Sequence, residues 1–167
     1  MNFMRWIRHW FTTPLAVRRA FPADALVRIE QAVAQAEQGH SGEIRFAVEA
    51  ALPWSYLKRG APARERALMV FAKLRVWDTE NNNGVLIYVE LADRSIEIVA
   101  DRGIARHVPA HEWQVLAQAM REHFRAGAFE TGVTEALAQV AQRLRQHYPL
   151  ADGVRNPDEL SNRPALL

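Results

Sequence analysis

The chain has 167 residues, of which 49% are hydrophobic and 24% are charged, and its formal net charge is +2. These values are typical of a single globular domain with a substantial core, and the small net charge, without a basic stripe interleaved with aromatic residues, argues against a nucleic-acid partner. The chain contains no cysteine, which excludes disulfides, thiolate catalysis and cysteine-bound metals.

The first part of the chain, residues 1–20, predicts a separate amphipathic segment. As a helix, the residues from Met1 to Phe11 would place large apolar side chains on one face and basic side chains on the opposite face. The apolar set comprises Phe3, Met4, Ile7, Trp10 and Phe11, and the basic set comprises Arg5, Arg8 and His9.

Two interpretations of this helix remain open. Arginine and tryptophan are the residues used by helices that lie in a membrane interface, which favours a membrane-surface anchor. Alternatively, the same apolar face packs on the domain or on a second copy of it. The candidate contact residues for a membrane or a protein partner are Trp6, Ile7, Trp10 and Phe11, together with Trp54 and Tyr56 further along the chain.

The sequence also bears on where the protein is found. No apolar run approaches the roughly 20 residues needed to span a bilayer. The first residues lack the pattern of a signal peptide, because charges interrupt the apolar part and no small-residue cleavage site follows. We therefore expect a cytoplasmic protein, peripheral to the inner membrane if the N-terminal helix binds lipid.

Residues 21–149 are predicted to form the domain itself. Apolar spacing predicts helices over Asp24–Gln38 and Ala63–Arg75, and clean alternation predicts a strand over Gly42–Ala50. The stretch between the strand and the second helix, Leu52–Gly60, is expected to be an aromatic loop.

A β-hairpin then organises the chain. The apolar run Val85–Val89 is typical of a strand covered on both faces. A turn is expected at Ala92-Asp93-Arg94, and residues 95–99 alternate as a half-exposed return strand.

The rest of the chain predicts two further helices, over residues 111–125 and 129–147, and a polar C-terminal tail over residues 150–167. Because the first two strands flank a helix, they should be parallel. Apolar stripes on four helices need two sheet faces to cover. The predicted fold class is therefore α/β, a three-layer α/β/α sandwich whose small mixed sheet contains a parallel pair and an antiparallel hairpin.

Polar residues gather at both ends of the hairpin. Glu49, Asp93 and Arg94 are expected near the carboxyl ends of the parallel strands, where open α/β sheets bind ligands. The opposite end is a candidate site for Ca²⁺ or Mg²⁺, which prefer oxygen ligands, although these residue types also form turns for purely local reasons. The candidate ligands are Asp78, Glu80, Asn82, Asn83 and Asp101.

The motifs of this region resemble those of the TPM domain family, named for a thylakoid-lumen phosphatase-like protein, a photosystem II repair protein and a nematode acetylcholine-receptor modulator. The short, soluble bacterial subgroup is the most similar part of the family, and its members often accompany a membrane-anchored TPM protein and a LemA-family protein. The matching motifs are Asn82-Asn83-Gly84-Val85-Leu86-Ile87, Asp93-Arg94, Ile96-Glu97-Ile98, Gly103-Ile104 and residues 124–132.

For activity, the resemblance implies weak acid phosphatase activity and calcium binding by acidic side chains on surface loops. The chain departs from the family pattern at Val108-Pro109-Ala110, where the family has Leu-Pro-Asp, so one candidate carboxylate is missing. The usual signatures of a cysteine-free phosphatase are also missing.

We therefore expect a non-catalytic TPM-type binding module that supports a membrane-associated assembly. By the resemblance, its partner would be a membrane-anchored TPM or LemA-type protein. The alternative is a weak acid phosphatase that depends on a divalent metal.

Overall fold

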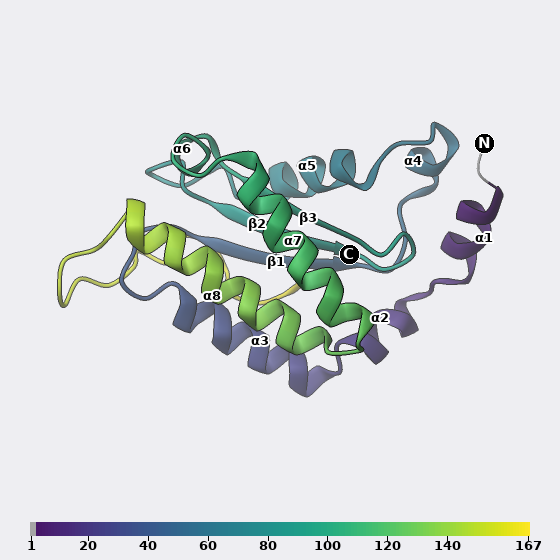
Figure 1. Ribbon diagram of the computed structural model, residues 1–167, viewed down its shortest axis with the longest axis horizontal. Helices are drawn as coiled ribbons and strands as arrows, with labels where there is room; N and C mark the ends of the chain where they lie inside the picture. The colour runs from purple at the N-terminus through teal and green to yellow at the C-terminus, as the bar shows by residue number, and fades with distance from the viewer. Residues whose placement is uncertain (1–2) are drawn as a thin grey trace.

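The computed structural model describes residues 3–167, so Met1 and Asn2 of the predicted N-terminal helix lie outside the described residues. Its centre is a four-stranded sheet with the order β3-β2-β1-β4 (Figure 1). β1 is parallel to both β2 and β4, whereas β2 and β3 form an antiparallel hairpin. The predicted parallel pair and hairpin are confirmed. The strands are β1 (Ile44–Glu49), β2 (Val85–Glu90), β3 (Ser95–Ala100) and β4 (Ala165–Leu166).

Helices cover both faces of the sheet, which confirms the predicted three-layer arrangement (Figure 1). Three long helices pack on one face and one helix packs on the other. No helix within residues 3–167 combines the length and the apolar character of a membrane span. The three are α3 (Ala23–Ala36), α7 (Ala110–Arg125) and α8 (Phe129–His147), and the single helix is α5 (Ala63–Lys73).

The protein has two hydrophobic cores, one on each face of the sheet, and side-chain alternation in β1 contributes to both. Ile44, Phe46 and Val48 enter the core beneath the three long helices. Ala47 points to the opposite face and joins the smaller core under α5. Successive side chains of a strand point to opposite faces, so an apolar strand can be buried on both sides.

Three further short helices connect the main elements. Helix α1 (Phe3–Phe11) ends before Thr12, and a second short helix, α2 (Pro14–Ala20), begins at Pro14, because a proline in the first turn has no hydrogen bond to lose. The aromatic loop contains α4 (Trp54–Lys58), which follows Pro53. The segment after β3 begins with α6 (Arg102–Ala105), and Asp101 caps this helix by accepting a hydrogen bond from the N–H of Arg102.

The C-terminal segment, residues 150–167, is not a free polar tail. The Asn156 side-chain amide donates to the carbonyl oxygens of His40 (2.8 Å) and Gly42 (2.9 Å). Leu160 packs against the smaller core, and β4 adds to the open edge of β1. The segment therefore belongs to the folded domain.

Candidate functional site

The carboxyl ends of β1 and β2 hold a buried charged group. Glu49, the last residue of β1, forms a two-pronged ion pair with Arg66 of α5, with hydrogen bonds of 2.6 and 2.8 Å. The Tyr88 hydroxyl donates to Glu49 at 2.6 Å, and burial raises the pKa of Tyr88 so that it stays protonated. All three side chains are buried. The carboxylate of Glu49 is therefore already satisfied from inside the protein.

Asp93 lies in the hairpin turn and is bound by the N-terminal helix α1 (Phe3–Phe11). Arg5 donates to Asp93 at 2.7 Å and to the carbonyl oxygen of Ala61, also at 2.7 Å. Arg8 donates to the second oxygen of Asp93 at 2.9 Å. Arg94, next in the turn, is exposed and adopts a left-handed backbone with φ of 54°. The predicted cluster of Glu49, Asp93 and Arg94 is thus divided, because the two carboxylates have different arginine partners.

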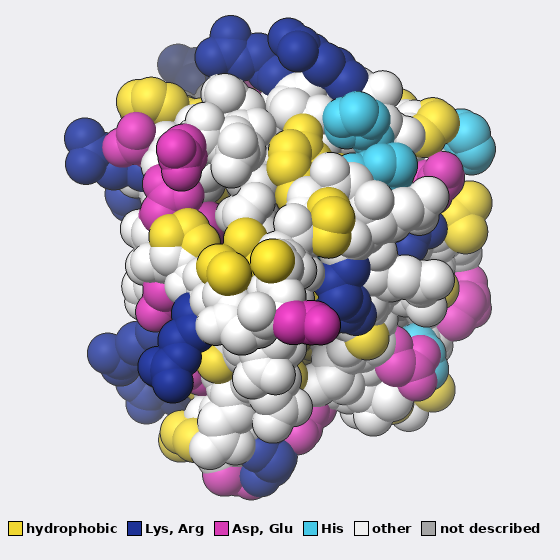
Figure 2. Space-filling model, turned by 90° about the vertical axis from the view of Figure 1, so that its left-hand side faces the viewer, with side chains coloured by type: hydrophobic (Ala, Val, Ile, Leu, Met, Phe, Trp, Pro, Cys, Tyr) yellow, Lys and Arg dark blue, Asp and Glu magenta, His cyan; other side chains and the backbone are white. Residues whose placement is uncertain are grey.

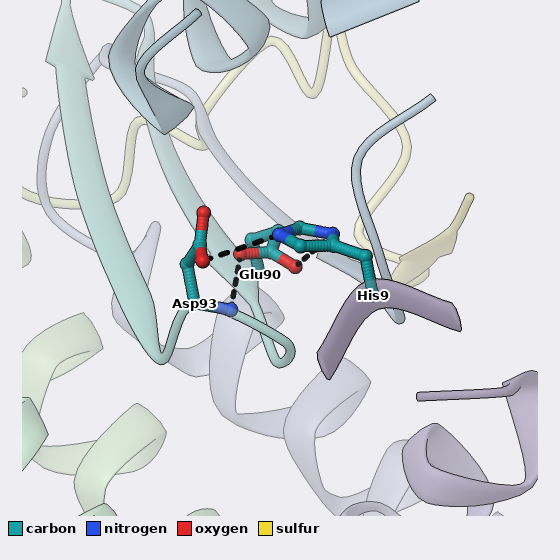
Figure 3. A group of neighbouring side chains, drawn as sticks. All are labelled: His9, Glu90 and Asp93. Carbon is teal, nitrogen blue, oxygen red and sulfur yellow. Dashed lines mark hydrogen bonds and ion pairs between the residues drawn. The ribbon is translucent and has the colours of Figure 1, made fainter. Parts of the chain in front are cut away.

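His9 completes the attachment of α1 to the hairpin. Its ring is buried and reaches from α1 toward the carboxylates of Glu90 and Asp93 (Figure 3). The N–H of Leu52 donates to Nδ1 at 3.1 Å, so Nε2 carries the proton and lies 3.2 Å from Asp93. Burial lowers the pKa of His9, which favours the neutral ring.

His9, Glu90 and Asp93 bring one ligand atom each to within 4.8 Å of one another, which makes them a candidate metal group. Their lone pairs are already in use. Both Asp93 oxygens accept from guanidinium groups. Glu90 accepts from the N–H groups of Ala92 (2.9 Å) and Asp93 (2.8 Å). A cation would have to displace two arginines, so the group acts as a clamp that holds α1 on the hairpin.

Glu90 should give the clamp a measurable pH dependence. Burial raises the pKa of Glu90 from 4.5 to about 7, outweighing the two backbone hydrogen bonds. The folded protein therefore keeps this proton over a window in which the unfolded chain loses it. The stability that Glu90 contributes is complete below its unfolded pKa and is lost as the pH rises through about 7.

As the pH rises from 4.5 to about 7, we expect the unfolding free energy of the wild type to fall relative to that of Glu90→Gln. The fall should be at most about 1.4 kcal/mol per pH unit. Urea unfolding at a series of pH values measures it, because the glutamine does not titrate. Glu80→Gln, at an exposed position, is the control. A difference that is constant with pH would contradict the assignment.

The orientation of α1 is the reverse of that in an ordinary surface helix. The basic side chains face the domain, whereas much of the apolar face is exposed. Only Trp6 and Ile7 are partly covered, and Trp6 contacts Trp54 edge to face at 4.3 Å. Packing on its own domain therefore covers only Trp6 and Ile7 of this face, and for the rest of the face a membrane surface and a second copy of the chain both stay predictions. The exposed side chains are Phe3 (74%), Met4 (65%), Trp10 (78%), Phe11 (76%) and Trp54 (61%).

We call the exposed apolar side chains of α1 and α4 the aromatic surface. A groove of about 410 Å³ lies in this surface. Tyr56, a predicted contact residue on α4, is only partly exposed, and its ring lies beneath the guanidinium groups of Arg59 and Arg66. The groove is lined by Trp6, Ile7, His9, Trp10, Phe11, Leu52, Trp54 and Leu57. Four of the predicted contact residues thus line one groove on α1, and Trp54 lies across from them.

The opposite end of the hairpin holds the five predicted metal ligands, and they have separate surroundings. Asn83 and Asp101 are buried, and each has one side-chain oxygen without a hydrogen-bond partner among the described residues. Asp78 and Glu80 are exposed. Asn82 adopts a left-handed backbone with φ of 51°. Neither of the two converging acidic groups within residues 3–167 contains any of these five residues.

A pocket of about 220 Å³ adjoins the Asn turn at this end. Figure 2 shows this side of the molecule, where Lys, Arg and His side chains gather along the upper part. Such a pocket suits an anion better than a cation. Its lining comprises Asn81, Asn82, Arg102, Gly103, Arg106, His107 and Tyr148.

Sequence reasoning missed His9, Arg66 and Glu90 as members of the polar groups. Glu90 had a signal, because it ends an otherwise apolar strand directly before a turn. No feature of the sequence marks Arg66 as a buried residue, because the region has several arginines and the pattern does not show which of them pairs with a buried carboxylate. His40 is also buried, with Nε2 2.8 Å from the Ala36 carbonyl oxygen and Nδ1 accepting from the N–H of Gly42.

Comparison with known proteins decides the family. A family model described as the TPM domain matches residues 19–143, which is well over half of the chain. The chain belongs to the TPM domain family. The match begins within α2 and ends within α8, so this TPM domain includes the whole hairpin but neither α1 nor the C-terminal segment.

Solved structures agree with this assignment. The TPM chain is similar to the BA42 protein from the psychrophilic bacterium Bizionia argentinensis, with 28% identity and a TM-score of 0.75 over 88% of this chain and 95% of that one. It also shares its fold with the N-terminal domain of a P. gingivalis protein, at 18% identity and a TM-score of 0.58 over 80% and 84% of the two chains. A search of curated proteins found no match.

Proposed function

We propose that this TPM protein is a non-catalytic binding module that attaches to an anionic membrane surface and there supports a membrane-associated protein assembly. The observation that carries the proposal is the reversed orientation of α1. Its basic face is fixed to Asp93, and its large apolar side chains are held out into solvent. Exposed aromatic side chains in one patch are costly unless another surface covers them.

The charge around the aromatic surface favours an anionic membrane as that covering surface. Residues 3–23 contain four arginines and no aspartate or glutamate. Arg8 remains half exposed after pairing with Asp93, and exposed Lys58 and Arg59 follow Trp54 on the neighbouring helix. Trp and Phe side chains flanked by Lys and Arg are the residues with which peripheral helices enter the headgroup region.

The proposal includes a location and a partner. A module held in this way would be cytoplasmic and peripheral to the inner membrane. The family resemblance suggests a membrane-anchored TPM or LemA-type protein as the partner, and membrane attachment would confine both to one surface.

The alternative function, a metal-dependent acid phosphatase, has weaker support. Its ligand set would need Asp78 and Glu80 to act with Asp101, but Asp78 and Glu80 are exposed while Asp101 is buried and caps α6. The basic pocket beside the Asn turn suits a phosphate group. A phosphate pocket without an assembled nucleophile favours binding over hydrolysis.

Vesicle co-sedimentation tests the proposed function. The wild type should bind vesicles that contain phosphatidylglycerol, less at high salt and less to pure phosphatidylcholine, because screening and loss of lipid charge weaken the basic contribution. The double variant Trp10→Ser/Phe11→Ser should bind at least about tenfold more weakly, since two aromatic side chains no longer enter the interface.

The matched control is Trp77→Ser/Val115→Ser, which removes exposed apolar side chains from α7 and from the loop after α5. It should bind as the wild type does. Wild-type protein that stays in the supernatant, or equal binding by the two double variants, would overturn membrane attachment. Both double variants change exposed residues, so circular dichroism should show an unchanged fold.

A further inference from the structure

The outer edge of β3 carries no further strand within residues 3–167. β3 ends the sheet order β3-β2-β1-β4 and pairs with β2 alone. Just after β3, the N–H of Asp101 bonds to the carbonyl oxygen of Gly84 on the β2 side. Because the backbone groups of successive residues alternate between the two edges of a strand, those of Ile96, Ile98 and Ala100 point outward. Such an edge is a template for one more strand.

Two arginine side chains meet this edge. The guanidinium group of Arg64, on α5, donates to the carbonyl oxygen of Ile98 at 2.6 Å. The guanidinium group of Arg121, on α7, donates to the carbonyl oxygen of Ile96 at 3.0 Å. Both outward carbonyl groups are thus bonded by side chains that an incoming strand would displace, and the displaced guanidinium groups would then need new acceptors.

Two hollows lie along the edge, with volumes of about 530 and 800 Å³. Ile96 and Arg121 line both hollows, so the two adjoin each other at the edge of β3. Trp113 contributes apolar surface to the smaller hollow, and Phe124 and Phe129 contribute it to the larger one. The edge therefore has space beside it, together with apolar surface for the alternate side chains of an added strand.

The charge of the hollows indicates which kind of segment would fit. Arg19, Arg94 and Arg121 line the larger hollow, and none of them forms an ion pair within residues 3–167. The carboxylates in its lining are already engaged, because Asp93 is bound by α1 and Glu90 by the backbone of the turn. Guanidinium groups beside an open edge favour a strand with acidic side chains.

A second copy of this chain fits the edge less well. Symmetric pairing of two β3 edges would bring Arg64 and Arg121 of one copy close to the same arginines of the other. Like charges placed together in an interface are costly. A partner segment that carries aspartate or glutamate meets the same arginines with the opposite charge.

We propose that the outer edge of β3 binds an extended, acidic segment of a partner protein by strand addition. The segment pairs its backbone with the outward groups of β3, places its carboxylates against Arg94 and Arg121, and packs apolar side chains into the two hollows. The proposal rests on the proposed function for the existence of a protein partner, and it gives that partner a binding edge and a chemistry.

Fluorescence anisotropy of a labelled peptide of alternating glutamate and valine, titrated with the full chain, tests the proposal. The wild type should bind this peptide, and it should bind a peptide with lysine in place of glutamate at least about tenfold more weakly. Arg94→Glu and Arg121→Glu should each lose at least about tenfold in affinity for the acidic peptide. Arg94 is exposed, so that variant should fold normally. Arg155→Glu, at an exposed position outside both hollows, is the matched control and should bind as the wild type does.

Amide hydrogen exchange distinguishes strand addition from charge attraction alone. With the acidic peptide bound, the N–H groups of Ile98 and Ala100 should exchange at least about tenfold more slowly, because they gain acceptors. The N–H of Glu97, which points toward β2, should exchange as before.

Three results would each overturn strand addition: no binding by the wild type, equal affinity of the wild type and both glutamate variants, or binding that leaves the exchange of Ile98 and Ala100 unchanged. The titration contains no lipid, so its failure would leave membrane attachment standing. Failure of vesicle binding, in turn, would leave peptide binding at β3 unaffected.

Discussion

Replacement of Glu49 by alanine is expected to lower the free energy of unfolding by about 3–5 kcal/mol, the range for breaking a buried ion pair. Both partners of this pair are almost inaccessible, with side chains that are 7% (Glu49) and 9% (Arg66) exposed. The variant leaves the guanidinium of Arg66 without its carboxylate and the Tyr88 hydroxyl without its acceptor. Urea unfolding followed by circular dichroism measures the loss.

The chain offers a matched control in the exposed pair of Arg59 and Glu65, whose side chains are 50% and 45% exposed. Glu65→Ala should leave the unfolding midpoint nearly unchanged, because solvent screens an exposed pair. If Glu49→Ala cost less than about 1 kcal/mol, the interpretation of Glu49 as a structural charge would be contradicted. Replacing both partners, as in Glu49→Leu/Arg66→Met, should recover part of the loss because no charge is left buried alone.

Gly84→Ala is expected to destabilise the protein by at least about 3 kcal/mol, at the upper end of the range for overpacking. A Cβ at this position would lie 2.0 Å from the carbonyl oxygen of Val76. The obstacle is backbone rather than the end of a flexible side chain, so β2 or the loop before it would have to move. Thermal or urea unfolding measures the change.

Gly127→Ala is the control for Gly84→Ala. Gly127 has φ of +75° but no neighbouring atom within 4 Å of a Cβ, so it tests backbone strain without a collision. We expect a cost of about 1 kcal/mol there. Equal costs at the two glycines would show that close packing against Val76 is not what requires Gly84.

These expectations give the Asn-Asn-Gly motif a structural meaning. Asn82 takes the left-handed conformation that asparagine tolerates. Asn83 is buried, its backbone N–H donates to the hydroxyl oxygen of Thr79, and its side-chain amide donates to the hydroxyl oxygen of Ser41. Gly84 allows the close approach of Val76. Backbone conformation, hydrogen bonds and close packing thus account for the residue type at each position of the motif.

Much of the fold could be predicted because the patterns that encode it are local. The apolar run of β2 and the alternation of β1 identify buried strands, and helical spacing identifies α3, α7 and α8. The C-terminal segment could not be predicted, because its contacts join Asn156 to His40 and Leu160 to Glu43, more than a hundred residues away. A polar sequence pattern carries no record of such distant partners.

The candidate sites could be predicted only in part, for a similar reason. The amphipathic pattern of α1 is visible in the sequence, but which face meets the domain depends on Asp93, some 85 residues later. Likewise, the sequence shows only that Glu37 follows a helix and that Glu43 precedes a strand. The fold brings the carboxylate of Asp158 to within 4.8 Å of theirs. Periodicity identifies faces, and it does not identify what each face contacts.

The short strand β4 has a consequence for self-association. Without it, β1 would form the open edge of the sheet, and its unpaired N–H and C=O groups would offer a template for a strand from another molecule. Residues 165–166 occupy that edge beside Ala47 and Val48, and the N–H of Leu167 bonds to the carbonyl oxygen of Val48. β4 therefore keeps this part of the β1 edge from pairing with a strand of another molecule.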